Sequence, residues 1–572
     1  MTAVRRLISI ACLAFAAITG SAQEAQTTTQ TTNAPVPRAT EPVTAPTDKD
    51  VSDPRALKLS LDDAVRTAIK QNLGIELSRY DFSEAGESLT GSWGVFDPLV
   101  TAQLGKTRAD SAQTSSLSGT SSGSTTADVQ FGQNLPTGGN YTIGFSNKRA
   151  TKGGGFGTDL SPGYTTGLDF GLTQPLARDF GVDITKRNIY IARNNLGINR
   201  ELFRTSLIET GNAVEQAYLD LVYARQFVDV VKESLFLARD QSRITQIRID
   251  VGASAPLDIL QPRVQIATTE ESLIVAVADV RNAEDRLRAL LNLPPADWDR
   301  PIIPTDSVVY TPVPVDTEAS IARAYELRPE IRENRLTTDI RRIQHLFARN
   351  QALPAVDAVV GYNLGGAGGR VVNLGTGVPV PDVPSTRYID ALQQVLRREN
   401  SGWNIGLNLS VPVFNISQRA EARRTELELD RSKVVEAQTR QNVAVDVRTT
   451  ARAIDTSAKE IVASRTAREA AEQNLDAERK RYENGMTTNF QVLQVQQQLS
   501  DARAREIASL VAYNKNVVLY HRAVGDLLDV LNIRVEEPEQ VREPAFFSRF
   551  DRYNWLNYQS QVDREERKND KH

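Results

Sequence analysis

The chain has 572 residues, of which 40% are apolar and 6% aromatic, and its formal net charge is −4 at pH 7. This composition is unusual for several compact domains and typical of long, solvated helices rich in alanine, glutamate, arginine and glutamine. The small net charge and the even spread of lysine and arginine argue against nucleic acid and against an acidic substrate as the partner.

The N-terminal segment, 1–22, has the layout of a secretory signal peptide. Arg5 and Arg6 precede an apolar run from Leu7 to Ile18, and small residues follow at the expected cleavage site. The run is too short to span a bilayer. The only cysteine, Cys12, lies inside it, so no disulfide, catalytic thiol or cysteine-bound metal is expected in the exported protein. Lipid attachment at Cys12 is left open.

The next segment, 23–57, is rich in threonine and proline and shows no apolar periodicity. It buries too little surface to offset the entropy of ordering, so we expect a disordered leader. At the other end, 536–572 is a tail whose aromatic residues have no assigned role.

Between the leader and the tail, the sequence predicts two structural repeats, 58–300 and 301–535, with the same order of elements. Four sequence blocks recur in the same order, which predicts an internal duplication. They are 68–80 with 324–336, 96–105 with 352–361, 167–176 with 404–413, and the segments around Gly252 and Gly485. Each copy is expected to run from a short helix through strands to a very long helix, a turn at glycine and a returning helix.

The expected strands alternate apolar and polar residues, as a β-strand with two different faces requires. They lie near 98–107, 127–135, 140–148, 166–176, 356–365 and 402–413. Their polar positions carry small uncharged residues more often than lysine or glutamate. This pattern favours a transmembrane β-barrel over a soluble sandwich. The residues expected to face the lumen are Thr101, Gln103, Asp169, Asn404 and Asn408.

One chain offers four to six strands, whereas the smallest membrane barrel needs about eight. An open sheet edge in lipid would leave backbone groups without hydrogen bonds, so several copies are expected to share one barrel. Three copies would give twelve or eighteen strands, and the sequence does not decide between them.

Two very long helices are predicted by apolar seams whose spacing alternates between three and four residues. The first runs from about Asp183 to Asp250, about 100 Å at 1.5 Å per residue. Such a seam also fits an ordinary bundle core, but a helix of this length that reverses at a glycine does not. The seam residues are Val214, Ala217, Leu221, Ala224, Val228, Val231, Leu235 and Ala238 in the first helix, and Val447, Ala451, Ile454, Ala458 and Ile461 in the second.

The order of these elements resembles the TolC-type outer-membrane efflux family over roughly residues 58–535. The likeness rests on "FDPLVTAQLG" at 96–105, the strand ends "QPL" and "VPVF", "AYLDLVYARQ" at 217–226, and the pattern G-x5-[DQ]-[IV]-L-Q after Gly252 and Gly485. It implies a mixed α/β membrane protein. Its oligomeric transmembrane β-barrel would continue into a long α-helical coiled-coil tunnel, with three copies forming a homotrimer.

The resemblance also implies a function and partners. The protein would be a passive exit duct of a tripartite efflux or type I secretion system, and not an enzyme. It would sit in outer-membrane lipid of a Gram-negative-type cell, extend into the periplasm, and receive substrates from an inner-membrane pump through a periplasmic adaptor that docks at the tips, Gly252 and Gly485. The alternative is a periplasmic coiled-coil adaptor or structural spacer.

The family carries its gate at the tip of the second hairpin. Alignment of the tip glycines places the gate tyrosine on Tyr482 and an acidic position of the first hairpin on Asp258. The family's arginine falls on Thr487, and its two acidic positions fall on Gln491 and Gln494. The resemblance therefore implies a tip without a basic latch or acidic rings, in which the glutamines line a neutral constriction. A solvated helix face explains the same glutamines equally well.

No residue pattern predicts catalysis, a cofactor or a metal. His345, His521 and His572 have no partner at metal-ligand spacing. The glycine-rich segments 152–157 and 365–370 superficially resemble phosphate loops, but no convincing helix follows them, so we expect extracellular loops. The loop 366–401, with a short helix at Tyr388–Arg398, is expected outside the cell, where it could narrow the mouth of the barrel.

Overall fold

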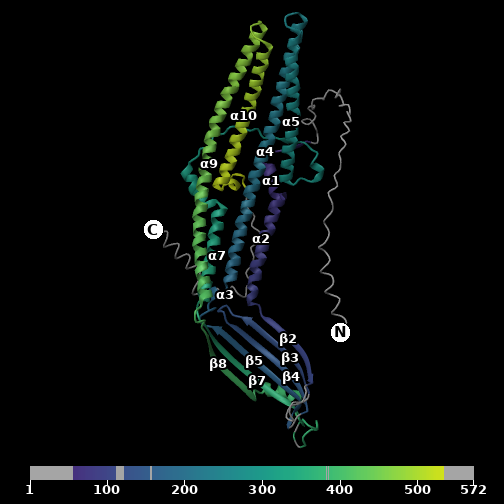
Figure 1. Ribbon diagram of the computed structural model, residues 1–572, viewed down its shortest axis with the longest axis vertical. Helices are drawn as coiled ribbons and strands as arrows, with labels where there is room; N and C mark the ends of the chain where they lie inside the picture. The colour runs from purple at the N-terminus through teal and green to yellow at the C-terminus, as the bar shows by residue number, and fades with distance from the viewer. Residues whose placement is uncertain (1–55, 111–120, 155–156, 382, 384, 534–572) are drawn as a thin grey trace, which may run out of the picture. The chain divides into compact units, whose positions relative to one another are not determined.

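The computed structural model describes residues 56–110, 121–154, 157–381, 383 and 385–533 (Figure 1). The expected signal peptide, Cys12, all but the last two residues of the expected leader, and the expected tail lie outside these residues. Among the described residues, no helix is both long and apolar enough to cross a membrane.

Long strands pair into one antiparallel sheet in the order β2-β3-β4-β5-β7-β8 (Figure 1). A separate parallel pair joins two short strands, β1 and β6. Within the described chain, β2 and β8 are the edges of the large sheet. The bounds are β1 Leu57–Leu59, β2 Leu99–Asp110, β3 Ser121–Asn134, β4 Asn140–Gly153, β5 Thr158–Pro175, β6 Ile302–Pro304, β7 Ala355–Asn373 and β8 Asn400–Ser410.

The glycine-rich segment 365–370 is not the loop that its composition predicted. It lies inside β7, which runs on to Asn373, and β4 likewise includes Lys152 and Gly153 of the other glycine-rich segment. The prediction was wrong because a run of glycines gives no alternation of apolar and polar residues. Here the glycines allow close packing, since a Cβ at Gly366 would collide with the carbonyl group of Ala391 in a neighbouring helix.

The register separates an apolar face of the sheet from a polar face. One apolar row crosses all six strands as directly paired residues, and residues two apart along a strand share its face. The row is Val100, Phe131, Ile143, Phe170, Tyr362 and Trp403. The opposite face carries all five residues expected to face a lumen, Thr101, Gln103, Asp169, Asn404 and Asn408, with pairs such as Gln103 with Asp128 and Asn408 with Asp357.

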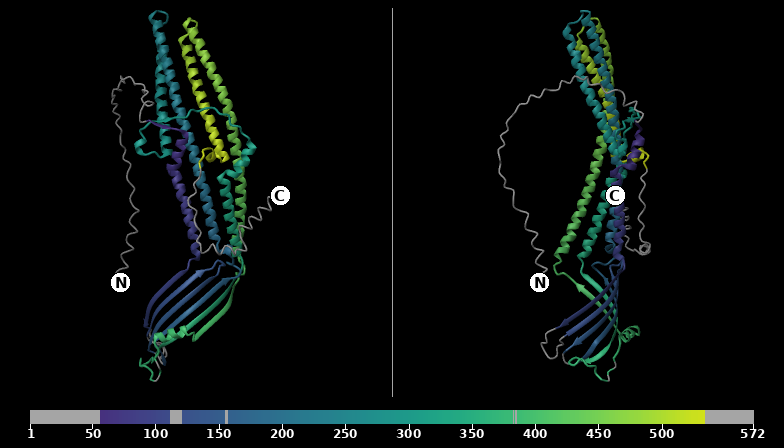
Figure 2. Two further views of the ribbon diagram at one scale, coloured as in Figure 1. Left: turned by 180° about the vertical axis from the view of Figure 1, so that it is seen from behind. Right: turned by 90° about the vertical axis from the view of Figure 1, so that its right-hand side faces the viewer.

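The helices include two of unusual length, α4 and α9, each followed by a returning helix. Figures 1 and 2 show the large sheet at one end of the described chain and both helical turns at the other. The helix bounds are α1 Leu61–Gln71, α2 Leu73–Ser92, α3 Val182–Thr185, α4 Arg187–Asp250, α5 Leu260–Leu291, α6 Thr317–Leu327, α7 Pro329–Gln351, α8 Tyr388–Leu396, α9 Ile416–Glu483, α10 Asn489–Val524 and α11 Leu527–Val530, with 3-10 turns η2 Trp93–Phe96, η3 Pro256–Ile259 and η4 Pro295–Asp297.

The predicted seams are the buried faces of these helices. All eight seam residues of α4 are buried, and in α9 all are buried except Ala458, which is half-buried next to the buried Ser457. α4 packs against α2, α5, α7 and α10, and α9 packs against α7 and α10. Because alanine contributes little buried area, these contacts stabilise the helices mainly through their length.

One acidic residue interrupts the buried face of α4. The side chain of Glu215 is 6% exposed, and its Oε1 atom has no hydrogen-bond partner in the described chain. Burial raises the pKa of Glu215 to about 7, although the nearby His521 opposes the shift. The carboxyl group is therefore held protonated at pH values where an exposed glutamate would be charged.

We expect the stability of the protein to fall as the pH rises from about 5 to about 8. In the window between the ordinary pKa of 4.5 and the raised pKa of about 7, the folded chain binds more protons than the unfolded chain. The free energy of unfolding therefore decreases with pH, by up to about 3 kcal/mol in total. Glu215→Gln should make the stability less dependent on pH. Melting temperatures in mild detergent at pH about 5 and about 8 measure the difference.

The matched control for Glu215→Gln is Glu271→Gln on α5, because Glu271 is exposed. That variant should keep the wild-type difference between the two melting temperatures. A Glu215→Gln protein with an unchanged pH dependence would contradict the assignment of this carboxyl group as the titrating one.

Candidate functional site

The two long hairpins reverse through the same backbone geometry. Gly252 and Gly485 have φ angles of 75° and 73°, a conformation that favours glycine. In the first turn, the Gly252 N–H donates to the Ile249 carbonyl at 2.9 Å and the Ala253 N–H donates to the Arg248 carbonyl at 2.7 Å. The second turn repeats both bonds, from Gly485 to Tyr482 and from Met486 to Arg481. Each helix thus ends in a Schellman motif, which satisfies its last carbonyl groups.

Tyr482 lies in the last turn of α9, where its side chain is 6% exposed. Its contact partner is Arg248, which belongs to α4 and therefore to the other hairpin. The Arg248 Nη1 atom donates to the Tyr482 carbonyl oxygen at 2.6 Å, and the guanidinium carbon lies 4.6 Å from the centre of the tyrosine ring. One cation therefore holds both the backbone and the aromatic face of Tyr482.

Sequence reasoning missed Arg248 because its contact joins residues far apart in the chain. The family resemblance implies a basic residue two positions after Gly485, where this chain has Thr487. The Thr487 hydroxyl group donates to Oε1 of the buried Glu478, which also pairs with Arg481 at 3.3 Å. Thr487 therefore ties the turn back to its own helix. A usable signal was present, since Arg248 precedes its glycine by four residues, as Arg481 precedes Gly485.

A second polar contact bridges the hairpins at the start of α10. The Gln241 Nε2 atom donates to Asn489 Oδ1 at 2.7 Å, and both side chains are buried. The Asn489 Nδ2 atom donates to the backbone carbonyl of Asp258 at 3.4 Å. The exposed Asp258 carboxylate accepts the Ala255 N–H at 3.1 Å and so caps η3 of its own turn. These contacts align the tips of the two hairpins.

The glutamines of α10 project away from these contacts. Gln491 and Gln494 are exposed, and neither side chain makes a hydrogen bond within the described chain. The neighbouring Val492 and Val495 are buried, so the two glutamines lie on the opposite side of the helix from its packed face. The structure therefore brings Tyr482, Thr487 and Asp258 into one connected tip, and it leaves Gln491 and Gln494 free to meet other groups.

The histidines have ordinary structural partners where they are described. His345 lies 3.3 Å from the Thr425 hydroxyl group, and His521 pairs with Asp526 at 2.9 Å. In the part of the chain that the structure describes, no group of three or more histidine, cysteine or acidic residues is arranged to hold a metal ion.

The sequence matches the family model described as "Outer membrane efflux protein" over residues 140–293 and 321–519. It is 24% identical over 234 residues to the outer membrane efflux protein BepC of Brucella suis biovar 1, a match that covers 39% of this chain and 48% of BepC. It is 28% identical over 175 residues to the toxin and drug export protein A of Aggregatibacter actinomycetemcomitans, covering 30% of this chain and 32% of that protein. The chain thus spans less than half the length of either curated relative.

The fold is similar to that of the CmeC outer membrane channel of Campylobacter jejuni. The TM-score is 0.59 at 16% sequence identity, and the match covers 84% of this chain and 87% of CmeC. The VceC outer membrane protein of Vibrio cholerae gives a TM-score of 0.57 at 14% identity, with coverage of 81% and 96%. At these identities the likeness concerns the fold.

Proposed function

The chain belongs to the outer membrane efflux protein family, and on this premise we propose that it is the outer-membrane exit duct of a tripartite efflux or type I secretion system. The observation that carries the proposal is the two-faced sheet joined to helices of 64 and 68 residues. An apolar face suits lipid, a polar face suits a wet lumen, and the helices are long enough to reach about 100 Å beyond the sheet. The family is one of channels, and no catalytic role is proposed.

Three copies would close the barrel. The outer edges of β2 and β8 have no partner strand within the described chain, and unpaired edges in hydrocarbon cost several kcal/mol per backbone group. Pairing of β8 from one copy with β2 from the next would remove both edges. A homotrimer of this sheet would then have eighteen strands, a size at which barrels enclose an aqueous channel.

An internal duplication accounts for the order of the elements. α1 and α6 have the same length, and α1, α2 and β2 begin 256 residues before α6, α7 and β7 respectively. The boundary between the proposed repeats, 58–300 and 301–535, falls between η4 and β6. This regularity supports a two-copy origin for the tunnel and the sheet.

The proposed location and partners follow from the direction of the helices. The sheet would lie in the outer membrane of a Gram-negative-type cell, and the tips at Gly252 and Gly485 would reach into the periplasm, where an adaptor and an inner-membrane pump would dock. The alternative of a coiled-coil adaptor or spacer does not account for strands of up to 19 residues with one apolar face.

Detergent extraction of the outer-membrane fraction, followed by mass measurement and planar-bilayer recording, tests the proposed duct. We expect a trimer that conducts ions and migrates differently on gels after heating. A monomer that conducts ions equally well would overturn the proposal. A trimer that never inserts into bilayers would instead favour the structural spacer.

We further expect weaker cation selectivity than acidic rings at the tip would give, since Gln491 and Gln494 would line the constriction without charge. Reversal potentials of single channels in a salt gradient measure this. Gln491→Glu supplies the matched comparison, because it adds one acidic ring per trimer and should shift the reversal potential toward that of potassium. Strong cation preference in the unaltered protein that disappears only when Gln491 is replaced would contradict the prediction.

A further inference from the structure

Helix α8 lies on the apolar face of the sheet. A Cβ at Gly368 would meet the carbonyl oxygen of Arg387 at 2.9 Å, and one at Gly366 would collide with Ala391, whereas one at Gly365 would meet nothing within 4 Å. Gly366 and Gly368 share their face of β7 with Leu364 and Tyr362, because side chains alternate along a strand. The helix is therefore on the same side as the row that contains Phe170 and Trp403.

Side-chain contacts confirm which face α8 covers. The Tyr388 hydroxyl group donates to Asn147 Oδ1 at 2.8 Å, and the Thr166 hydroxyl group donates to the same atom. The Tyr388 ring also meets that of Tyr164 at a centroid distance of 6.1 Å. Along β7, the apolar-face positions run from Val356 to Leu364, so α8 begins where this apolar band ends.

α8 itself carries apolar side chains on two sides. Ala391 and Val395 are buried, and Ala391 lies against Gly366 and Gly368 of β7, whereas Ile389 and Leu396 are 43% and 74% exposed. Ile389, the half-buried Leu392 and Leu396 follow the i, i+3, i+7 spacing of one helix face, and this face is exposed at Ile389 and Leu396. A helix with apolar residues on both sides suits a position between a protein surface and lipid.

Arginines flank this outward stripe. Arg387 precedes the helix, and Arg397 and Arg398 follow it, all of them exposed. Asp390 accepts the backbone N–H of Arg387 at 2.6 Å, and Glu399 pairs with Arg397 at 3.8 Å, so the segment retains a positive charge. Apolar side chains bounded by arginines complement a leaflet of acyl chains topped by anionic headgroups.

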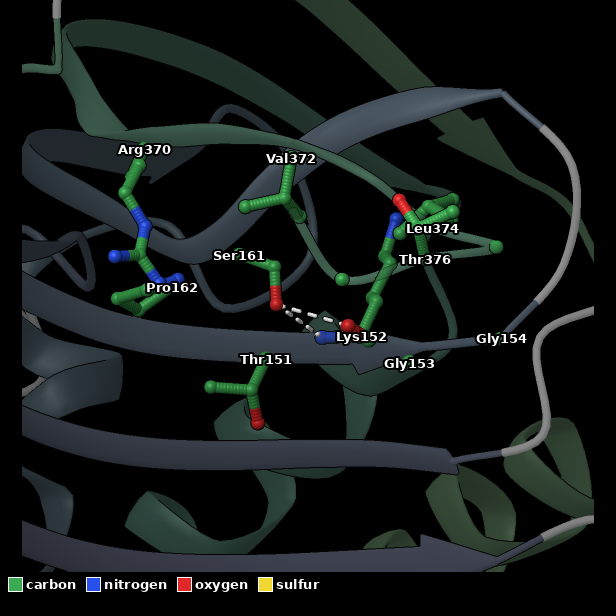
Figure 3. A pocket seen from close by; sticks show the side chains of 12 residues that line it. Thr151, Lys152, Gly153, Gly154, Ser161, Pro162, Arg370, Val372, Leu374 and Thr376 are labelled. Carbon is green, nitrogen blue, oxygen red and sulfur yellow. Dashed lines mark hydrogen bonds between the residues drawn. The ribbon is translucent and has the colours of Figure 1, made fainter. Parts of the chain in front are cut away.

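A hollow of about 470 Å³ opens beside Arg370 of β7 (Figure 3). Arg370 and Lys152 contribute cations to its lining, together with Ser161, Pro162 and Thr376. Lys152 pairs with Asp159 at 2.6 Å, whereas no ion pair joins Arg370 to any described residue. The segment before α8 is bonded to the strand next to Arg370, since the Thr386 N–H donates to the Gly369 carbonyl at 2.9 Å.

We propose that α8 is an interfacial helix that lies in the outer leaflet beside the barrel, with Ile389 and Leu396 among acyl chains and the flanking arginines bound to phosphorylated lipid headgroups. This inference rests on the proposed function, which assigns the apolar face to lipid. It moves the segment from the mouth of the barrel, where sequence reasoning placed it, to the outside wall. The hollow beside Arg370 provides room for a headgroup phosphate.

Site-directed fluorescence quenching tests the position of α8. In a Cys12→Ser background, a fluorophore would be attached to Ile389→Cys or Leu396→Cys, and the full-length protein would be inserted into phosphatidylcholine vesicles with nitroxide-labelled acyl chains. Both positions should be quenched. Leu407→Cys on the apolar face should also be quenched, and Asn404→Cys on the polar face should not. Quenching at Leu407 alone would overturn the interfacial helix, whereas absence of quenching at Leu407 would overturn the membrane barrel itself.

The headgroup preference is tested with nitroxide-labelled phosphatidic acid in place of labelled phosphatidylcholine. Phosphatidic acid should be enriched at Leu396 by about fivefold for each arginine that reaches a phosphate. The variant R387Q/R397Q/R398Q should lose this enrichment and keep the quenching. Its matched control, R263Q/R281Q/R286Q, removes three exposed arginines of α5 and should keep both. Equal enrichment in the two triple variants, or its removal by millimolar inorganic phosphate, would overturn specific binding of lipid headgroups.

Discussion

Deletion of the β3–β4 hairpin is expected to give a narrower barrel that still assembles. In the described sheet, β3 pairs with β2 and β4, and β4 pairs with β3 and β5. β2 and β5 run in opposite directions, so their direct pairing would preserve an antiparallel sheet. A trimer of the remaining strands would have twelve instead of eighteen, and barrel diameter would fall by about one third, since diameter grows roughly linearly with strand number.

The deletion would join Asp110, at the end of β2, to Thr158, at the start of β5, through a short glycine-rich turn. Both residues lie at the end of the sheet away from the helices, so the deletion cuts no helix, although it removes the bonds of the hairpin to the Phe96 carbonyl oxygen and to the Gly181 N–H. Electron cryomicroscopy of the unaltered and the shortened trimer measures the two barrel diameters. The largest polymer that enters the lumen from the barrel side gives a second measure of each diameter. The unaltered protein should show eighteen strands, and any other number would refute the proposed closure independently of the variant.

Arg248→Ala is expected to open the tip. The change removes a hydrogen bond from a charged donor to the Tyr482 carbonyl oxygen and a cation contact with the ring. Together these contribute about 2 kcal/mol, after allowance for the partial exposure of Arg248, so the open population should rise by at least about tenfold. The turn itself should survive, because the same carbonyl oxygen still accepts the Gly485 N–H at 3.0 Å.

Single-channel recording measures the effect of Arg248→Ala as longer or larger open events. Arg243→Ala is the matched control, since Arg243 lies on the same helix and, among the described residues, pairs with Asp240 one turn away and not with the other hairpin. Arg248→Lys should fall between the two, because lysine keeps the charge and loses the planar contact with the ring. Identical traces from Arg248→Ala and Arg243→Ala would show that the contact with Tyr482 does not hold the tip closed.

Local periodicity correctly predicted which face of a strand is apolar and which face of a long helix is buried. The alternation of Ile405, Leu407 and Leu409 with Asn404 and Asn408 indicated a strand with two faces, and the register places them so. The seam from Val214 to Ala238 indicated the buried face of α4, and all its residues are buried. In both cases the signal lies within one short stretch of chain.

The features that sequence reasoning missed depend on contacts between distant segments. Arg248 meets Tyr482 across 234 positions, so its contact with the tyrosine could not be inferred from the residues around Gly485, even though Arg248 and Arg481 hold matching positions before their glycines. The glycines of β7 lack alternation because they accommodate α8, and the side of the sheet that α8 covers follows only from the register. The proposed closure of the barrel would depend on other copies of the chain, which a single sequence does not describe.

The pairing of β5 with β7 has a consequence for how the protein is made. β5 ends at Pro175 and β7 begins at Ala355, so both helices of the first hairpin must be synthesised before β5 receives its second neighbour. Until then its backbone edge is open to pairing with other chains, and contacts of such long sequence separation form slowly. We therefore expect an aggregation-prone intermediate and, if the protein is exported as proposed, a need for a periplasmic chaperone at this stage.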